Sequence, residues 1–243
     1  MIPHDDRGLL LGDGLFETML ALDGDLPFIA AHLDRMAAGC EVLNLPFDRA
    51  QAERIVREAA PAAGRFAVRL TLTAGSGGRG LDRPAAPVPV LFAKAAPSVP
   101  PTTPATLIIA TTRRNEGSPA SRLKSLSHLD NVLARAEAAA AGADEAVMLN
   151  NRGEVACAAA ANLFWIREGR LFTPRLDCGV LAGVTRARLL ARHDVEEVVA
   201  GVEALETADA IFLTNSLIGV REVSKLGGKE FAPHLLVGEL RST

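Results

Sequence analysis

The sequence predicts an α+β protein of two domains. In both halves of the 243-residue chain, segments with helical spacing of apolar residues interleave with segments that have the pattern of strands. Between the halves, residues 97–104 read PSVPPTTP, a composition typical of a semi-rigid linker, with a long surface loop as the alternative. We expect a small N-terminal domain over 1–97, a linker over 98–104 and a larger domain over 105–243.

The first half is predicted to contain two helices followed by two strands. Apolar residues recur every three or four positions in both helical segments, and prolines follow each of them closely. The next segment alternates apolar and polar residues, which predicts a half-buried strand. The expected elements are helices over 28–44 and 49–60, strands over 66–73 and 87–93, and a glycine-rich turn at 75–80.

The second half repeats this mixture of strands and helices. We expect strands over 106–111, 145–150, 154–158 and 209–214, helices over 128–141 and from about Gly183, and hairpins over 162–173 and 220–231. The second hairpin has Gly227 and Gly228 at its turn. We find no glycine-rich phosphate fingerprint of the Rossmann or Walker type.

Composition and charge narrow the class of protein. The formal net charge is −3, which gives no indication of a nucleic-acid or membrane surface. Cys40, Cys157 and Cys178 are far apart and lack metal-ligand spacing, which favours a reduced, cytoplasmic protein. The N-terminus has no apolar core of a signal peptide, and the longest apolar run, 155–166, is shorter than the roughly 20 residues of a membrane span.

Lys124 is the first candidate for chemistry. It lies between Leu123 and Leu126, just before the predicted helix at 128–141. Apolar neighbours desolvate an amine, and the positive end of a helix dipole disfavours a cation, so both lower the pKa of the lysine. A lysine with a lowered pKa is a nucleophile suited to Schiff-base formation. The alternative is an ordinary solvated lysine near a helix start.

Three further features suit a bound phosphate. Arg35 lies beside the apolar stripe of the helix at 28–44, where its head could reach a buried anion. Residues 183–185 begin a helix with a glycine and a hydroxyl group, and Asn215 and Ser216 follow an apolar strand. Each also has an ordinary explanation as a surface pair, a helix start or a turn. Together with an amine nucleophile they suggest pyridoxal phosphate.

Seven short motifs follow one another along the chain. They are Asp6-Arg7-Gly8-Leu9, Gly12-Asp13-Gly14-Leu15-Phe16-Glu17-Thr18, His32-Leu33-Asp34-Arg35, Leu123-Lys124-Ser125-Leu126, Asn162-Leu163-Phe164-Trp165, Leu181-Ala182-Gly183-Val184-Thr185-Arg186 and Thr214-Asn215-Ser216-Leu217. Their order is that of the class IV aminotransferases, the fold-type IV pyridoxal-phosphate enzymes, and the chain resembles that family from about Asp6 to Val223. Within the family, the segments that begin at Lys124 and Phe212 resemble the aminodeoxychorismate lyase branch most.

The resemblance implies a homodimer of two-domain subunits, each with a small N-terminal α/β sandwich and a larger C-terminal domain with a β-barrel-like core. It implies Lys124 as the catalytic Schiff-base lysine, with Leu181 against the pyridine ring of the cofactor. The residues expected to bind pyridoxal 5'-phosphate are Arg35, Lys124, Cys157, Leu181, Val184, Thr185, Asn215 and Ser216.

Cys157 is the most serious departure from the family pattern. It stands five residues before Asn162, where the family usually has a glutamate that hydrogen-bonds the protonated pyridine nitrogen. Glu154 is three residues away and would face the other side of a strand, so it cannot substitute. Loss of a charge-assisted hydrogen bond is worth roughly 1.5–3 kcal/mol, which lowers the protonated population of the ring by about one to two decades.

We expect a lyase that converts 4-amino-4-deoxychorismate to p-aminobenzoate and pyruvate, a step toward folate, because formation of an aromatic product tolerates a weakened electron sink. Two alternatives stay open. One is an aminotransferase for branched-chain or D-amino acids. The other is a family member with weak or no catalysis. The presence of Cys157 in place of the glutamate and the absence of tyrosine would explain such a loss.

Carboxylate groups of the substrate need cationic or N–H partners. Arg114 is the favoured candidate, with Arg69 and Arg79 as alternatives, although each has the ordinary explanation of a solvated surface arginine. The backbone N–H groups of Leu217 and Ile218 could serve the same purpose.

Overall fold

The computed structural model describes residues 2–78 and 80–241, which form two compact units. The first unit comprises residues as far as Val99 together with Leu123–Ser127, and the second comprises Pro100–Arg122 and the chain from His128 onward. The change of unit at Val99 falls within the linker expected over 98–104. The segment that carries Lys124, however, groups with the first unit, whereas the sequence placed it in the larger domain.

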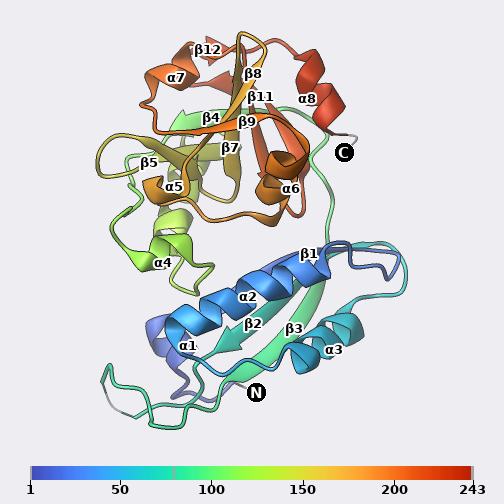
Figure 1. Cartoon of the computed structure of the whole chain (residues 1–243), viewed down its shortest axis with the longest axis vertical. Helices are drawn as coiled ribbons and strands as arrows, with labels where there is room; N and C mark the ends of the chain where they lie inside the picture. Colours follow the sequence, from blue (N-terminus) through green and yellow to red (C-terminus); the bar gives the residue numbers. More distant parts are fainter. Residues whose placement is uncertain (1, 79, 242–243) are drawn as a thin grey trace. The chain divides into compact units, whose positions relative to one another are not determined.

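The first unit is a three-stranded antiparallel sheet with two helices against one face. Its sheet order is β1-β2-β3, and α2 contacts β1 while α3 contacts β2 and β3 (Figure 1). The core between them contains Leu33, Met36, Val68 and Leu70, all buried. The elements are α1 (Arg7–Leu11), β1 (Gly14–Leu22), α2 (Ile29–Leu43), α3 (Arg49–Ala59), β2 (Arg65–Thr73) and β3 (Val90–Pro97).

Leu123–Ser127 joins the first unit because it pairs with the free edge of β1. The N–H of Phe16 donates to the carbonyl of Lys124 at 2.9 Å, and the N–H of Leu126 donates to the carbonyl of Gly14 at 2.9 Å. Leu15 and Ser125 form an antiparallel bridge between these two bonds. An exposed strand edge has unpaired N–H and C=O groups, and the segment satisfies some of them.

The second unit is built on a curled nine-stranded sheet of order β6-β5-β4-β11-β10-β7-β8-β9, with β12 paired to β11. Pairs β4–β5, β4–β11 and β8–β9 are parallel, and the others are antiparallel. The strands are β4 (Ala105–Ile109), β5 (Glu145–Leu149), β6 (Val155–Ala158), β7 (Asn162–Arg167), β8 (Arg170–Pro174), β9 (Val195–Val198), β10 (Ala210–Asn215), β11 (Gly219–Leu226) and β12 (Lys229–Glu230).

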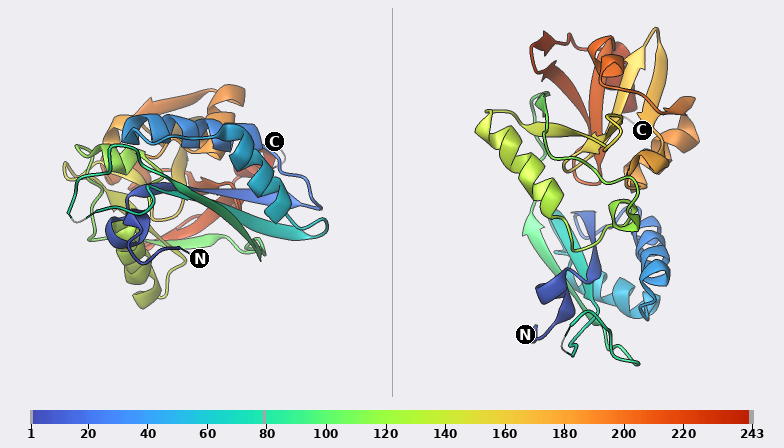
Figure 2. Two further views of the ribbon diagram at one scale, coloured as in Figure 1. Left: turned by 90° about the horizontal axis from the view of Figure 1, so that it is seen from below. Right: turned by 90° about the vertical axis from the view of Figure 1, so that its left-hand side faces the viewer.

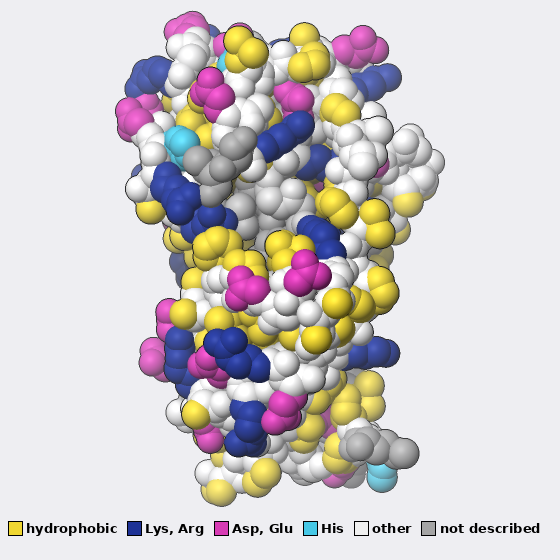
Figure 3. All heavy atoms as spheres, turned by 90° about the vertical axis from the view of Figure 1, so that its right-hand side faces the viewer, with side chains coloured by type: hydrophobic (Ala, Val, Ile, Leu, Met, Phe, Trp, Pro, Cys, Tyr) yellow, Lys and Arg dark blue, Asp and Glu magenta, His cyan; other side chains and the backbone are white. Residues whose placement is uncertain are grey.

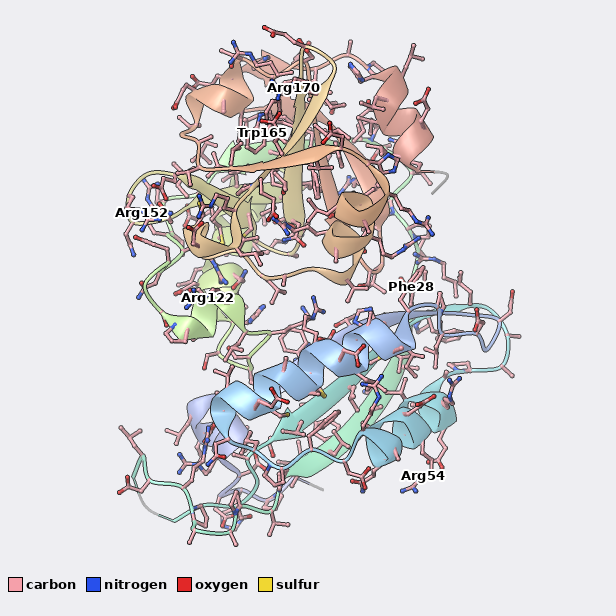
Figure 4. The ribbon with its side chains drawn as sticks, viewed as in Figure 1. Phe28, Arg54, Arg122, Arg152, Trp165 and Arg170 are labelled. Atoms are coloured by element: carbon pink, nitrogen blue, oxygen red, sulfur yellow. The ribbon has the colours of Figure 1, made fainter. Side chains whose placement is uncertain are left out.

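The two ends of this sheet meet, which makes it barrel-like. Glu154 forms an antiparallel bridge with Gly201, and the N–H of Val155 donates to the carbonyl of Ala200 at 2.8 Å. These residues adjoin β6 and β9, the outermost strands in the sheet order. The interior is apolar, and Trp165 of β7, labelled in Figure 4, is buried there and stacks on Phe172.

Helices cover the outside of the curled sheet. Ala134 and Ala138 of α5 pack with Met148 and Cys157, and α5 lies against β5 (Figure 2). Leu189 of α6 packs with Phe164 on another part of the outer face. The helices of the second unit are α4 (Pro119–Arg122), α5 (Leu129–Ala140), the 3₁₀ helix η1 (Leu176–Cys178), α6 (Val184–Arg192), α7 (Glu203–Glu206) and α8 (Leu235–Leu240).

Charged side chains of both signs are mixed on the surface. On α3, Arg54 pairs with Glu58 and Arg57 pairs with Glu53, four residues apart in both cases, and the labelled Arg54 projects outward in Figure 4. Basic and acidic side chains are likewise interspersed on the face in Figure 3. Among the described residues, none of the helices combines the length and hydropathy that a membrane crossing requires.

Candidate functional site

Lys124 lies at the edge of β1, on the face of the sheet opposite α2. Because its carbonyl is bonded to Phe16, its side chain projects on the same side as the Phe16 ring, and Nζ lies 4.2 Å from the centroid of that ring. The lysine is half-buried, as is Leu123 beside it. The predicted apolar surroundings are therefore present, with an aromatic ring that the sequence analysis did not anticipate.

The pKa of Lys124 is lowered to about 8, first by burial and then by the positive charge of Arg35. Arg69 acts in the same direction, and the negative charge of Glu17 opposes it. An amine with this pKa is half neutral near pH 8, whereas an ordinary lysine is half neutral near pH 10.4. Lys124 can therefore act as a nucleophile near neutral pH.

Arg35 is held by a buried carboxylate. Its Nε and Nη2 donate to the two oxygens of Glu17 at 2.7 and 2.6 Å, and Nδ1 of His32 lies 2.7 Å from Oε2 of the same carboxylate. Both Glu17 and His32 are 1% exposed. The anion that Arg35 contacts is therefore the Glu17 carboxylate, which was not predicted from the sequence. The phosphate-binding role of Arg35 stays a prediction.

The face of the first sheet that carries Lys124 is cationic. The guanidinium carbon of Arg69 lies 3.7 Å from the centroid of the Phe16 ring, and burial lowers the pKa of this arginine. Lys94 on β3 is directly opposite Arg69 in the register, so the two side chains share this face. Like charges in this arrangement repel each other, and an anionic ligand would relieve the repulsion.

In the second unit, α6 presents a helix N-terminus suited to an anion. Gly183 is the N-cap and α6 begins at Val184, so the cap residue has no side chain that could bond the first-turn N–H groups. Its first-turn N–H groups and the Thr185 hydroxyl can thus serve a phosphate. The side chain of Asn162 fixes this turn by donating from Nδ2 to the carbonyl of Leu181 at 2.9 Å.

Gly183 is required by the close approach of Asn162. A Cβ at position 183 would lie 1.9 Å from Oδ1 of Asn162, although the backbone angles at this position are ordinary. We expect Gly183→Ala to destabilise the protein by about 1–3 kcal/mol, because Asn162 must move and lose its bond to the turn.

Urea unfolding measures this effect, and Gly238→Ala is the matched control. Gly238 lies in α8, and a Cβ there would meet nothing within 4 Å. Alanine is favoured over glycine in a helix, so this control should be neutral or slightly stabilising. Equal unfolding midpoints for the two variants would contradict the steric explanation.

The turn after β10 contains Asn215 and Ser216. Oδ1 of Asn215 accepts from the N–H groups of Leu217 and Ile218, both at 2.9 Å, and its Nδ2 donates to the carbonyl of Ala160 at 3.0 Å. The two N–H groups suggested for a substrate carboxylate are therefore already used within the turn, which argues against that role. Asn215 organises the turn on which Ser216 is presented.

The geometry also argues against Arg114 as a carboxylate-binding residue. Its side chain is buried, and it donates to the carbonyl of Gly179 at 3.2 Å, to Oδ1 of Asn131 at 3.0 Å and to the carbonyl of Ser121. These bonds give Arg114 a structural role, because they tie it to the loop at Gly179, to α4 and to α5. Arg69 is the better candidate, and Arg79 lies outside the described residues.

Cys157 is buried on β6 opposite Met148, and burial raises the pKa of its thiol. A neutral thiol cannot replace the charge of a glutamate. Glu154 does not take over, because its carboxylate accepts from Asn150 and Arg152. The prediction that Glu154 cannot substitute agrees with this geometry.

The residues present fit most of what pyridoxal phosphate requires. Lys124 supplies an amine with a lowered pKa, and the α6 N-terminus supplies donors for a phosphate. The family resemblance implies that position 157 would face a protonated ring nitrogen, and the neutral thiol of Cys157 does not supply the negative charge that such a nitrogen needs.

Comparison with known proteins identifies the family. The family model described as amino-transferase class IV matches residues 14–226, so the chain belongs to the class IV aminotransferases, whose members depend on pyridoxal phosphate. This confirms the resemblance drawn from the seven motifs. The fold is that of the fold-type IV enzymes, as predicted.

Similar proteins include both activities considered from the sequence. A putative branched-chain-amino-acid aminotransferase of Methanocaldococcus jannaschii is 33% identical over 92% of this chain and 82% of its own length. An aminodeoxychorismate lyase of Bacillus subtilis is 30% identical over 91% of this chain and 80% of its own length. The crystal structure of 4-amino-4-deoxychorismate lyase from Pseudomonas aeruginosa superposes with a TM-score of 0.90, at 32% identity, over 100% of this chain and 93% of that one.

Proposed function

We propose that this protein is a pyridoxal-phosphate-dependent lyase that converts 4-amino-4-deoxychorismate to p-aminobenzoate and pyruvate. Cys157 is the observation that carries the proposal, because it removes the charge that favours a strong electron sink. Transamination depends on that sink to reprotonate the cofactor carbon. The lyase reaction also gains free energy from the aromatic product, so it tolerates the thiol better.

The proposal assigns cofactor-binding roles in both units. In the first unit these are Lys124 for the aldehyde and Arg35 for the phosphate. In the second unit the residues are Cys157, Leu181, Val184, Thr185, Asn215 and Ser216. The bound cofactor would supply a carbonyl that captures the substrate amine and a ring that withdraws electrons from the adjacent bonds.

Lys124 is proposed to move the proton of the reaction. The free amine of Lys124 would take the proton from the ring carbon that carries the amino group of the substrate. The electron pair left at that carbon would form a ring double bond as the neighbouring carbon–oxygen bond breaks, so the six-membered ring would become aromatic. The departing enolpyruvate would take up a proton, which protonated Lys124 can return, and would become pyruvate. A base with a pKa of about 8 is matched to this transfer near neutral pH.

The cationic face supports a substrate with two carboxylates. Aminodeoxychorismate has one carboxylate on its ring and one on its enolpyruvyl group. Arg69 and Lys94 lie opposite each other in the register on the face that carries Lys124, and Arg69 is fixed against Phe16. We propose that Arg69 binds one of the two carboxylates.

The purified protein, supplied with pyridoxal phosphate, is expected to form p-aminobenzoate and pyruvate in equal amounts from aminodeoxychorismate. The same preparation should react more slowly with a panel of branched-chain and D-amino donors. Brisk transamination without p-aminobenzoate would instead support an aminotransferase, the second candidate, which the 33% identity to the archaeal relative favours. A protein that stays colourless with added cofactor would support neither activity.

A further inference from the structure

The environment of Lys124 contains one buried carboxylate that the proposed reaction does not use directly. Glu17 is 1% exposed and accepts three hydrogen bonds, two from Arg35 and one involving Nδ1 of His32. Bonds to these partners hold the pKa of Glu17 below its usual range despite its burial. A buried carboxylate is costly to desolvate, so a site that keeps one has charge partners arranged around it.

Backbone pairing brings Glu17 close to Lys124. Phe16 is bonded to Lys124 through the backbone, and Glu17 is the next residue along β1. Its side chain points to the α2 face, whereas Phe16 and Lys124 point to the opposite face. The glutamate therefore acts on the lysine through charge at short range rather than through a direct hydrogen bond.

Four neighbours act on the ammonium of Lys124. Arg35 on α2 and Arg69 on β2 repel it, while Glu17 on β1 attracts it. The Phe16 ring, also on β1, stabilises the ammonium as a cation–π partner. Glu17 is the carboxylate in this set, and it also holds Arg35 in place. One residue therefore attracts the Lys124 ammonium and also positions one of the two arginines that repel it.

We propose that Glu17 is a positioning residue that anchors Arg35 beside Lys124 and keeps the lysine able to carry a proton near neutral pH. This inference rests on the proposed role of Lys124 in proton transfer. A lysine surrounded only by Arg35 and Arg69 would be neutral at a lower pH and would be a weaker base. The carboxylate offsets these two positive charges and keeps the base matched to the pH at which it works.

The test is the pH dependence of acetic anhydride labelling of Lys124 in the protein without cofactor, read by peptide mass spectrometry. Exposed Lys225 is the internal reference for reagent concentration. Only a neutral amine reacts, so the labelling rate reports the midpoint of the Lys124 titration. The measurement needs neither substrate nor lyase activity. The proposed role of Glu17 can therefore be refuted while the proposed function holds, and the proposed function can be refuted while the role of Glu17 holds.

Glu17→Gln is expected to lower the labelling midpoint of Lys124 by about one pH unit, because the attraction of one negative charge is lost. A variant that loses its fold would expose Lys124 and move the midpoint upward toward about 10.4. Loss of the charge and loss of the fold therefore shift the labelling midpoint in opposite directions. Glu17→Asp keeps the charge and should keep the wild-type midpoint.

A second pair of variants keeps the proposal testable if Glu17→Gln folds poorly. Arg35→Gln removes a positive charge and should raise the midpoint of Lys124. The double variant Glu17→Gln/Arg35→Gln removes both charges and avoids an unpaired buried ion, so it should fold and should lie between the two single variants. An unchanged midpoint in the double and both single variants, or an upward shift in folded Glu17→Gln, would overturn the proposal.

Discussion

Lys124→Ala is expected to lower the conversion of aminodeoxychorismate by at least about 10³-fold, since general base catalysis alone contributes roughly 10²–10⁴-fold and the lysine also binds the cofactor. The variant should lose the absorption band that arises when pyridoxal phosphate is bound to a lysine. Stability should change little, because Lys124 is only half-buried and its ammonium is repelled by Arg35 and Arg69.

Lys225→Ala is the matched control for this loss. Lys225 lies on β11 of the second unit and is exposed, so its removal should leave the absorption band and the activity unchanged. Borohydride reduction of the wild-type protein followed by peptide mapping would locate the modified lysine directly. A Lys124→Ala protein that keeps both the band and the reaction would place the aldehyde-binding lysine elsewhere and refute the assignment.

Helices and strands were predicted correctly where the buried residues recur with the regular spacing of a single helix or strand. The helix expected over 28–44 and the strand expected over 66–73 agree with α2 (Ile29–Leu43) and β2 (Arg65–Thr73). Strand β1 was not predicted from the sequence, and its buried positions include Glu17 between Leu15 and Met19. A charged residue at an inward position breaks the apolar alternation, and only partners from another element make its burial favourable.

The unit to which Lys124 belongs could not be found from local pattern. The backbone groups that hold it belong to Gly14 and Phe16, more than a hundred residues earlier in the chain. Pairing of this kind depends on which strand edge remains open after the rest of the sheet has formed. The residues next to Lys124 in the sequence therefore do not indicate the strand edge with which it pairs.

The same reasoning separates the site residues that could be predicted from those that could not. A glycine before a hydroxyl residue marked the α6 N-terminus, because the local chemistry is enough to define it. Arg114 and the N–H groups of Leu217 and Ile218 looked available in the sequence, yet folding supplies acceptors for all of them. Donors on loops are therefore the least predictable part of such a site.

Cys157→Glu is expected to raise the rate of transamination by about 10- to 100-fold, the effect of restoring a charge-assisted hydrogen bond worth roughly 1.5–3 kcal/mol. The new carboxylate would be attracted by the positive charge of Arg114 and repelled by the negative charge of Glu145, the two charges that act on the group at this position. The larger side chain must still enter a packed apolar cluster with Met148 and Cys178, so stability should fall by about 1–3 kcal/mol.

Cys157→Gln separates charge from size in this experiment. It has nearly the same volume as the glutamate variant and should lose similar stability, but it cannot neutralise a protonated ring nitrogen. If charge is what the natural protein lacks, only the glutamate variant gains transamination with amino donors, while formation of p-aminobenzoate changes little in either. Equal rates in the two variants would show that the thiol does not limit the electron sink, and the main argument for a lyase over an aminotransferase would then fail.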